Sequence, residues 1–206
     1  MLIGLAVVLL LAGLFALPID RASAQYFREH LYTPLFRFAY KITDLAKGGP
    51  WIAAAAVAYV GTQVWMMTAS RPPLLMTISD YALALLASFV TGSVVLHVLK
   101  IFLGRRRPRD DVEHGLYGFR YFTWQLQYDS FPSGHAMTIF SVAVLASIIV
   151  PMLAPLWFAI ALALALTRAM LIAHFLSDVL IGAALAIVAT RETLVYLFPY
   201  LAPGWL

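Results

Sequence analysis

The sequence predicts an all-α fold: a polytopic integral membrane helical bundle with six transmembrane helices. Of its 206 residues, 63% are hydrophobic and 12% are charged, whereas soluble domains are about half apolar and a quarter charged. The apolar residues are also concentrated in long runs, and runs of about 18 or more indicate membrane-spanning helices. Because no internal repeat or low-complexity linker divides the chain, residues 1–206 are expected to form one domain.

Six apolar segments follow one another along the chain. Pro151 and Pro155 predict a tight turn between the fourth and fifth segments, and Arg71-Pro72-Pro73 predicts one between the second and third. Such short connections are typical of antiparallel neighbours in a bundle. The segments span residues 2–17, 51–69, 74–103, 137–153, 156–169 and 179–198.

The N-terminal region combines two signals. Ala22-Ser23-Ala24 resembles a signal-peptidase site, but no Lys or Arg precedes the apolar run and residues 18–21 intervene. We therefore expect the first segment to be a retained helix. Residues 21–47 mix four further cations with many aromatic and leucine side chains, which predicts an amphipathic segment lying at the membrane interface.

Composition also restricts the partners. The chain has no cysteine, so disulfides and thiolate metal sites are excluded. Its formal charge of +4 is modest, and most basic residues lie beside apolar runs. This pattern favours the lipid bilayer and anionic lipid headgroups over nucleic acid as partners.

The order of the segments predicts where polar residues meet. If segments three to six each cross the membrane once, three places lie on the same side: residues 100–108, 132–135 and 168–178. Polar residues interrupt the apolar sequence at each of them. Since ionisable residues are expensive inside a membrane, their presence there predicts a functional site.

Three cations belong to this expected site. Lys100 and Arg107 are seven residues apart, so two helical turns would return them to one face. Arg168 lies in the last turns of the fifth segment, and its planar guanidinium suits two phosphate oxygens. The neighbouring Arg105, Arg106 and Arg109 are interpreted instead as anchors that extend toward the membrane surface.

The stretch Pro132-Ser133-Gly134-His135 precedes the fourth segment. Ser133 and Gly134 stand where a helix begins, and the unpaired N–H groups of a helix start bind anions. An ordinary helix cap would give the same pattern. His135 favours the site, because it follows on the side where the cations are expected.

His174 and Asp178 are four residues apart and would share one face of a helix. A carboxylate that accepts a hydrogen bond from one imidazole nitrogen leaves the other nitrogen free to attack. Alternatively, the two side chains satisfy one another in the bundle core. Three cations and a second histidine on the same side favour a catalytic site.

Together, Lys100-x6-Arg107-Pro108, Pro132-Ser133-Gly134-His135 and Arg168-x5-His174-x3-Asp178 resemble the three-part signature of the type 2 phosphatidic acid phosphatase and vanadium haloperoxidase superfamily. The resemblance implies a bacterial membrane lipid phosphatase. It assigns His174 as nucleophile, His135 as general acid and Asp178 as the residue that orients His174. Phosphate binding is assigned to Lys100, Arg107, Ser133, Gly134 and Arg168. One departure is Thr167, where the family usually has serine; the hydroxyl is kept.

The resemblance further implies hydrolysis through a phosphohistidine, without a metal or cofactor. A metal site at Asp110, Asp111, Glu113 and His114 is a weaker alternative. Two other functions remain open: a vanadate-dependent haloperoxidase-like enzyme and a non-catalytic membrane protein with a vestigial phosphate pocket. Undecaprenyl diphosphate, phosphatidylglycerol phosphate, phosphatidic acid and lipid A phosphates are all substrates of bacterial relatives, and the sequence does not choose among them.

Two arguments on sidedness conflict. All Lys and Arg residues except Arg71 and Arg191 lie on the side of the expected site, which by the positive-inside rule would face the cytoplasm. Several of these cations are explained by phosphate or by the interfacial segment, however. The resemblance implies an inner-membrane protein whose site faces the periplasm, and this is the orientation we expect.

Overall fold

The computed structural model describes residues 1–68 and 72–205. Within these residues it contains nine α-helices, short 3-10 turns and no strand beyond two isolated bridges at Arg105. The helices are α1 (Leu2–Ala16), α2 (Asp20–Glu29), α3 (Pro34–Ile42), α4 (Gly48–Thr68), α5 (Pro73–Phe102), α6 (Pro108–His114), α7 (Gly134–Ile149), α8 (Ala154–Met170) and α9 (Leu176–Leu197).

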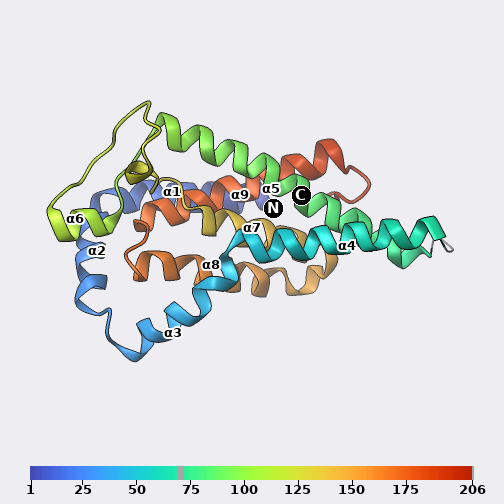
Figure 1. Ribbon diagram of the computed structural model, residues 1–206, viewed down its shortest axis with the longest axis horizontal. Helices are drawn as coiled ribbons and strands as arrows, with labels where there is room; N and C mark the ends of the chain where they lie inside the picture. Colours follow the sequence, from blue (N-terminus) through green and yellow to red (C-terminus); the bar gives the residue numbers. More distant parts are fainter. Residues whose placement is uncertain (69–71, 206) are drawn as a thin grey trace.

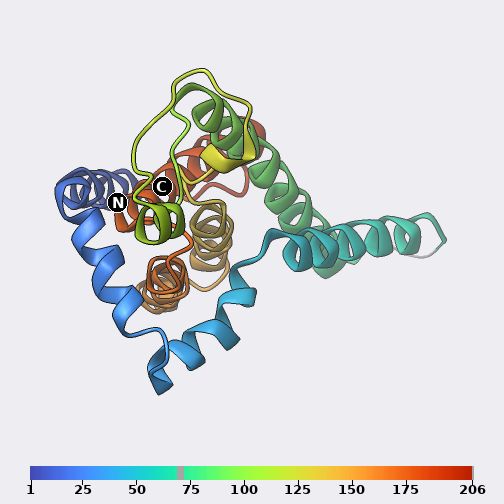
Figure 2. The same ribbon diagram turned by 60° about the vertical axis from the view of Figure 1, so that its left-hand side comes forward.

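The long helices run along the long axis of an elongated bundle, as Figure 1 shows. The short helices α2, α3 and α6 gather at one end, together with the loop that joins α6 to α7. The α4–α5 hairpin extends toward the opposite end, and Figure 2 shows α4 and the start of α5 projecting together from the remaining helices. One end of the molecule therefore carries nearly all of its irregular and polar structure.

The core is made mostly of small and β-branched residues. Helix α7 packs against α8 and α9, and α1 packs along α9. Two glycines allow close approach: a Cβ on Gly13 would lie 2.5 Å from Ile181, and one on Gly182 would lie 2.8 Å from the carbonyl oxygen of Ser133. The second contact brings α9 against the start of α7, which is the expected site.

The predicted fold class is confirmed, and the predicted count of six spans is roughly supported. Among the described residues, four helical stretches are long and apolar enough to cross a membrane: Leu2–Glu29, Pro73–Phe102, Pro151–Met170 and Leu176–Leu197. The other two predicted spans correspond to α7, which is apolar but has only 16 residues, and to α4, which has 21 residues rich in alanine and glycine.

The boundaries differ from prediction in informative places. The fourth segment begins three residues earlier than expected, so Gly134 and His135 form the first turn of α7. The amphipathic region 21–47 is two helices, α2 and α3, followed by a 3-10 turn at Thr43–Ala46. Thr33, in extended conformation before Pro34, separates them. Of the predicted turn at residues 71–73, Arg71 lies outside the described residues, and α5 begins at Pro73.

Candidate active site

The structure brings the three polar places together through hydrogen bonds. The amide of Ser133 donates to the carbonyl oxygen of Asp178 at 3.0 Å, which joins the second motif to the third. Arg107 joins the first motif to the segment before α7 through Asp129. The site therefore lies where the ends of α5, α8 and α9 meet the start of α7.

His174 occupies the centre of this site. It lies in the connection between α8 and α9, and only 4% of its surface is exposed. Its Nδ1 is 2.7 Å from the carbonyl oxygen of Ser130, which requires a proton on Nδ1 and leaves Nε2 without one. Burial, then the nearby cations Arg107, Lys100 and Arg168, hold the pKa of His174 well below its usual range. His174 is thus a neutral imidazole surrounded by cations.

Asp178 is buried beside His174 without a hydrogen bond to it, contrary to the direct pairing that we expected. Because Asp178 is on the first turn of α9 and His174 precedes that helix, the two do not share a helical face. Instead, Asp178 accepts hydrogen bonds from the Ser130 hydroxyl at 2.6 Å and from the Phe175 amide at 3.0 Å. Ser130 therefore links the carboxylate of Asp178 to the imidazole of His174.

Arg105 is completely buried, so its interpretation as an anchor at the membrane surface is wrong. Its guanidinium donates to Asp178 at 2.6 Å and to Asp20 of α2 at 2.8 Å. It also packs over the ring of Phe175, with the guanidinium carbon 4.1 Å from the ring centroid. A buried arginine needs such partners, because an unpaired charge in the interior is very costly.

Lys100 and Arg107 converge on one carboxylate. Asp129 accepts from Nε and Nη2 of Arg107 at 2.8 and 3.0 Å, in the two-point geometry that a phosphate would also use. The ammonium of Lys100 donates to the main-chain oxygen of Asp129 and lies 3.9 Å from its carboxylate. Asp129 therefore holds both cations of the first motif.

Arg168 stands at the end of α8, and its strongest polar contact is weak: Nη1 lies 3.4 Å from the hydroxyl of Thr43. Thr167 donates to the same hydroxyl at 2.9 Å, so its side chain serves to hold the 3-10 turn beside Arg168. The Nε atoms of Arg168 and Arg105 and Nε2 of His135 are buried without a hydrogen-bond partner among the described residues. Unpaired donors at Arg168 and His135 are available to a phosphate ester.

At the start of α7, some polar groups are used in hydrogen bonds within the protein and others are free to bind an anion. The hydroxyl of Ser133 accepts from the amide of Ala136 at 3.5 Å, as a helix cap does, and the Ser133 amide is used by Asp178. The amides of Gly134 and His135 lie in the first turn, where a helix leaves N–H groups without intrahelical partners. We therefore expect the amides of Gly134 and His135, more than that of Ser133, to bind the anion.

A basic hollow adjoins the site. It has a volume of about 830 Å³ and lies between α2, α3, the Thr43–Ala46 turn, α6 and the end of α8. Lys47 and Arg28 are paired with Asp44 and Glu113 at its margin. The other cations of the hollow have no carboxylate partner among the described residues: Arg37, Lys41, Arg109 and Arg168.

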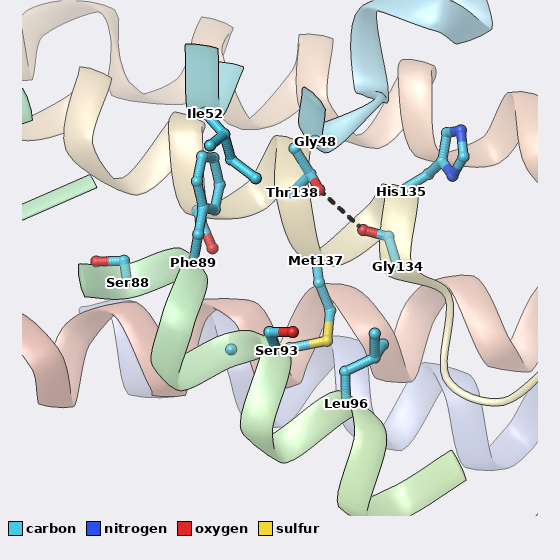
Figure 3. A pocket seen from close by; sticks show the side chains of 12 residues that line it. Gly48, Ile52, Ser88, Phe89, Ser93, Leu96, Gly134, His135, Met137 and Thr138 are labelled. Carbon is cyan, nitrogen blue, oxygen red and sulfur yellow. Dashed lines mark hydrogen bonds between the residues drawn. The ribbon is translucent and has the colours of Figure 1, made fainter. Parts of the chain in front are cut away.

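An apolar groove reaches the site from the bundle interior. Its volume is about 260 Å³, and Figure 3 shows His135 and Gly134 at one end of it. Small side chains of α4, α5 and α7 leave the space open, and the Thr138 hydroxyl is satisfied by the Gly134 carbonyl at 3.1 Å. The lining residues are Gly48, Ile52, Ser88, Phe89, Gly92, Ser93, Leu96, Gly134, His135, Met137, Thr138 and Ser141.

Two acidic residues of α6 form ion pairs with α2. Asp111 accepts two hydrogen bonds from Arg21, at 2.8 and 2.9 Å, and Glu113 pairs with Arg28 at 3.4 Å. Both arginines lie on α2, so these pairs fasten α6 to the N-terminal region. Among the described residues, no group of three or more His, Asp or Glu side chains is placed to hold a metal ion.

Four residues were not assigned to the site from the sequence: Asp20, Arg105, Asp129 and Ser130. Asp20 is a single charge at the end of an apolar run, and Arg105 is one of four arginines between residues 105 and 109. The fixed spacing of the motifs does not include them. Only the fold shows that the side chain of Arg105 turns inward while that of Arg109 faces the hollow.

A family model provides the deciding comparison. The model of the PAP2 superfamily matches residues 81–201, more than half of the chain and all three motifs. The chain belongs to the PAP2 superfamily. The part that matches this family begins within α5 and includes α6 to α9, whereas α1 to α4 lie outside it.

Two curated relatives each match nearly half of this chain. The lipid A 1-phosphatase of Rhizobium etli is 32% identical over 100 residues, which are 48% of this chain and 43% of that protein. The lipid A 1-phosphatase of Rhizobium johnstonii is 33% identical over 95 residues, which are 46% of this chain and 39% of that protein. The chain therefore matches less than half the length of either relative.

A solved structure resembles the whole fold. The crystal structure of Aquifex aeolicus LpxE superimposes with a TM-score of 0.55, over 84% of this chain and 94% of that chain. The two sequences are 20% identical. At that identity the likeness shows a common fold, and it extends beyond the PAP2 match to helices outside residues 81–201.

Proposed function

We propose that this protein is a metal-independent phosphatase of membrane lipid phosphates that works through a phosphohistidine. The observation that carries the proposal is His174: a buried, neutral imidazole with Nδ1 held by Ser130 and Nε2 free among three cations. Membership of the PAP2 superfamily and the names of the two curated relatives support it.

In the first step, Nε2 of His174 attacks phosphorus, and the bond from phosphorus to the lipid oxygen breaks. His135 gives a proton to that oxygen, so the lipid leaves as an alcohol or, from a diphosphate, as a monophosphate. In the second step, His135 takes a proton from water, whose oxygen attacks phosphorus. The phosphorus–nitrogen bond breaks, inorganic phosphate leaves, and His174 is neutral again.

The cations supply the stabilisation that this reaction needs. Uncatalysed hydrolysis of phosphate monoesters is extremely slow, so the site must lower the barrier by a large amount. Lys100, Arg107 and Arg168 match the charge on the equatorial phosphoryl oxygens, together with the free amides of Gly134 and His135. Asp129 holds Lys100 and Arg107 beside the site before substrate binds, which limits reorganisation during the reaction.

The apolar groove suits one hydrocarbon chain of the lipid. It runs between α4, α5 and α7 and ends at Gly134 and His135, so a chain lying in it would carry its phosphate toward the cations (Figure 3). Figure 2 shows that the α4–α5 hairpin projects from the bundle, so in a membrane its outer faces would contact lipid. A substrate embedded in the membrane could therefore enter sideways, without leaving the bilayer.

The basic hollow favours a headgroup with more than one anionic group. Arg37, Lys41 and Arg109 lack carboxylate partners and lie next to Arg168, so a second anion can bind there while the first phosphate is at His174. Within the substrates considered, a lipid A-type phosphate fits this arrangement, and both curated relatives carry the name lipid A 1-phosphatase. We therefore place lipid A-type phosphates first and undecaprenyl diphosphate second.

The purified protein in detergent should be assayed for phosphate release with lipid A-type phosphate, undecaprenyl diphosphate, phosphatidylglycerol phosphate and phosphatidic acid. We expect turnover in the presence of a chelator, and inhibition by vanadate, which adopts the five-coordinate geometry of the transferring phosphoryl group. Hydrolysis that a chelator stops and Mg²⁺ restores would contradict the metal-free mechanism. Halide oxidation with vanadate, or no phosphate release from any lipid, would favour the haloperoxidase or non-catalytic alternatives.

The hollow can be tested separately by the double substitution Arg37→Gln and Lys41→Gln. We expect KM to rise by about tenfold for lipid A-type phosphate, because two charge-assisted contacts are lost, and to stay nearly constant for phosphatidic acid. Arg120→Gln is the matched control, since the guanidinium of Arg120 donates to Gln125 and packs over Tyr128, both outside the hollow. An equal rise for both lipids would contradict a second anion site.

A further inference from the structure

The third motif is held by a buried hydrogen-bond network that begins outside the region matched by the family model. The carboxylate of Asp20, on α2, accepts from Nη2 of Arg105 at 2.8 Å. The Nη1 atom of the same guanidinium donates to Asp178 at 2.6 Å and to the Ser177 hydroxyl at 2.8 Å. None of these four side chains is exposed to solvent.

Asp20 also binds the start of α9 directly. Its Oδ1 accepts from the main-chain amide of Ser177 at 3.0 Å, and its Oδ2 accepts from the Ser177 hydroxyl. Ser177 is in the first turn of α9, where an amide has no intrahelical partner and a negative charge is favourable. Asp20 therefore fixes the N-terminal end of the helix that carries Asp178.

The network continues from Asp178 to the nucleophile. Ser130 is held at two points: its hydroxyl donates to Asp178, which Arg105 binds, and its amide donates to the main-chain oxygen of Arg105 at 3.0 Å. The carbonyl oxygen of Ser130 then accepts from Nδ1 of His174 at 2.7 Å. A shift of Arg105 would move Ser130 at both points and so release the imidazole.

We propose that Asp20 and Arg105 are positioning residues that keep His174 in its Nδ1-protonated form, with Nε2 aimed at the phosphate. This role rests on the proposed function, in which His174 is the nucleophile. It explains why an arginine and an aspartate that touch no substrate are buried beside the site, although burial of charged groups is costly. It also makes the N-terminal helices part of the catalytic unit.

The direct test is the tautomer of His174. The full-length protein, labelled with 15N-histidine in detergent micelles, has five histidines, and His174→Gln identifies the signal of interest. In the parent protein, the nitrogen shifts of the signal that His174→Gln removes should be those of an Nδ1-protonated imidazole. Asp20→Asn, which removes the charge but keeps the shape, should give a mixture of tautomers.

Kinetics give the second readout. With a lipid phosphate that the parent hydrolyses, Asp20→Asn should lower kcat by about tenfold, because small displacements of a reacting group are costly. KM should change little, since Lys100, Arg107 and Arg168 are untouched. Arg105→Lys should lower kcat further, because an ammonium cannot bridge two carboxylates as the planar guanidinium does. Asp20→Glu should recover part of the loss.

Arg21→Gln is the matched control. Arg21 is the next residue of the same helix and donates to Asp111, so its loss loosens α2 without removing a hydrogen bond of the network. We expect a single tautomer and nearly parental kcat. Equal losses in Arg21→Gln and Asp20→Asn would show that α2 acts only as packing and would overturn the proposal.

An unchanged His174 tautomer and an unchanged kcat in Asp20→Asn would also overturn the proposal. If Asp20→Asn does not fold, Ser130→Ala removes only the hydroxyl that links Asp178 to the Ser130 main chain, and the same mixture of tautomers is expected; a single tautomer there contradicts the proposal. A parent protein that hydrolyses no lipid phosphate yet shows the predicted tautomers would instead count against the proposed function.

Discussion

The guanidinium of Arg107 is occupied by the carboxylate of Asp129, through hydrogen bonds of 2.8 and 3.0 Å to Nε and Nη2. The same fork is expected to bind the phosphate. Asp129 therefore has two opposing effects: it orients Arg107, and its negative charge repels the incoming dianion. Since 30% of the Asp129 side chain is exposed, it can move aside without breaking the core.

We expect Asp129→Asn to strengthen anion binding. Removing one negative charge beside Lys100 and Arg107 should lower KM and the inhibition constant for vanadate by about fivefold, a modest effect because the pair is partly solvated. Both constants are measured with the purified protein in detergent. A rise in both would mean that orientation of Arg107 is the more important role of Asp129.

His174→Ala should abolish turnover, because the proposed nucleophile is removed; the loss should be at least about a thousandfold. Asp178→Asn should cost less, since Nε2 of His174 is still present. His114→Ala is the control, as His114 is an exposed histidine at the end of α6. Activity within a few-fold of the parent in His174→Ala would remove His174 as the nucleophile. Thermal unfolding in detergent shows that each variant is folded.

The pH dependence follows from the state of His174. Burial and the cations Arg107, Lys100 and Arg168 lower the pKa of His174 below the ordinary value of 6.5, so the attacking neutral form persists into mildly acidic solution. Arg107→Gln removes one of these cations and should raise that pKa. The acidic limb of kcat/KM should therefore move to higher pH in Arg107→Gln than in the parent, although the maximum is lower. No movement, or movement to lower pH, contradicts this electrostatic account.

The apolar groove predicts a dependence on chain length. Gly92→Leu would fill the groove from α5, where a side chain has only the flexible end of Met137 as a close neighbour. KM should rise on the order of tenfold for long-chain lipid phosphates, because several buried methylene contacts are lost, and change little for a soluble short-chain phosphate. Gly61→Leu, on α4 and facing open space, is the control. Equal effects on both substrates would place the chain elsewhere.

The orientation of the site is open to direct labelling. His114→Cys marks the end of the molecule that carries the site. The neighbouring Gly115 is unsuitable for a cysteine, because its φ of +69° disfavours any side chain. Pro73→Cys marks the opposite end of α5 (Figure 1). For a periplasmic site, an impermeant thiol reagent on intact spheroplasts should label position 114 and spare position 73. The reverse pattern would place the site in the cytoplasm.

Much of the fold could be predicted, because length and hydropathy decide where helices lie in a membrane protein. The predicted bounds of α5 and α9 are within a few residues of those observed. The start of α7 was missed because Gly134 and His135 are not apolar, so an apolar run underestimates a helix whose first turn lines a site.

The sequence was less informative about the hydrogen-bond partners of the site residues. Their spacing of four residues predicted a hydrogen bond between His174 and Asp178. The helix begins between them, at Leu176, and each side chain is instead hydrogen-bonded to Ser130. Likewise, nothing local distinguishes Arg105 from Arg106, which packs on Tyr128. Whether an arginine is buried depends on carboxylates from distant helices, and such contacts are set by tertiary structure.

The link between Asp20 and Ser177 has a consequence for biogenesis. The two residues are 157 positions apart, so the contact cannot form while α9 is still within the ribosome or the translocon. Until then Arg105 lacks Asp178, the second of its two carboxylate partners, and the imidazole of His174 is not yet fixed. A nascent chain that already displays Lys100, Arg107 and the start of α7 would bind lipid phosphates without hydrolysing them. Catalytic competence would then appear in one step, when the last long helix docks beside the first.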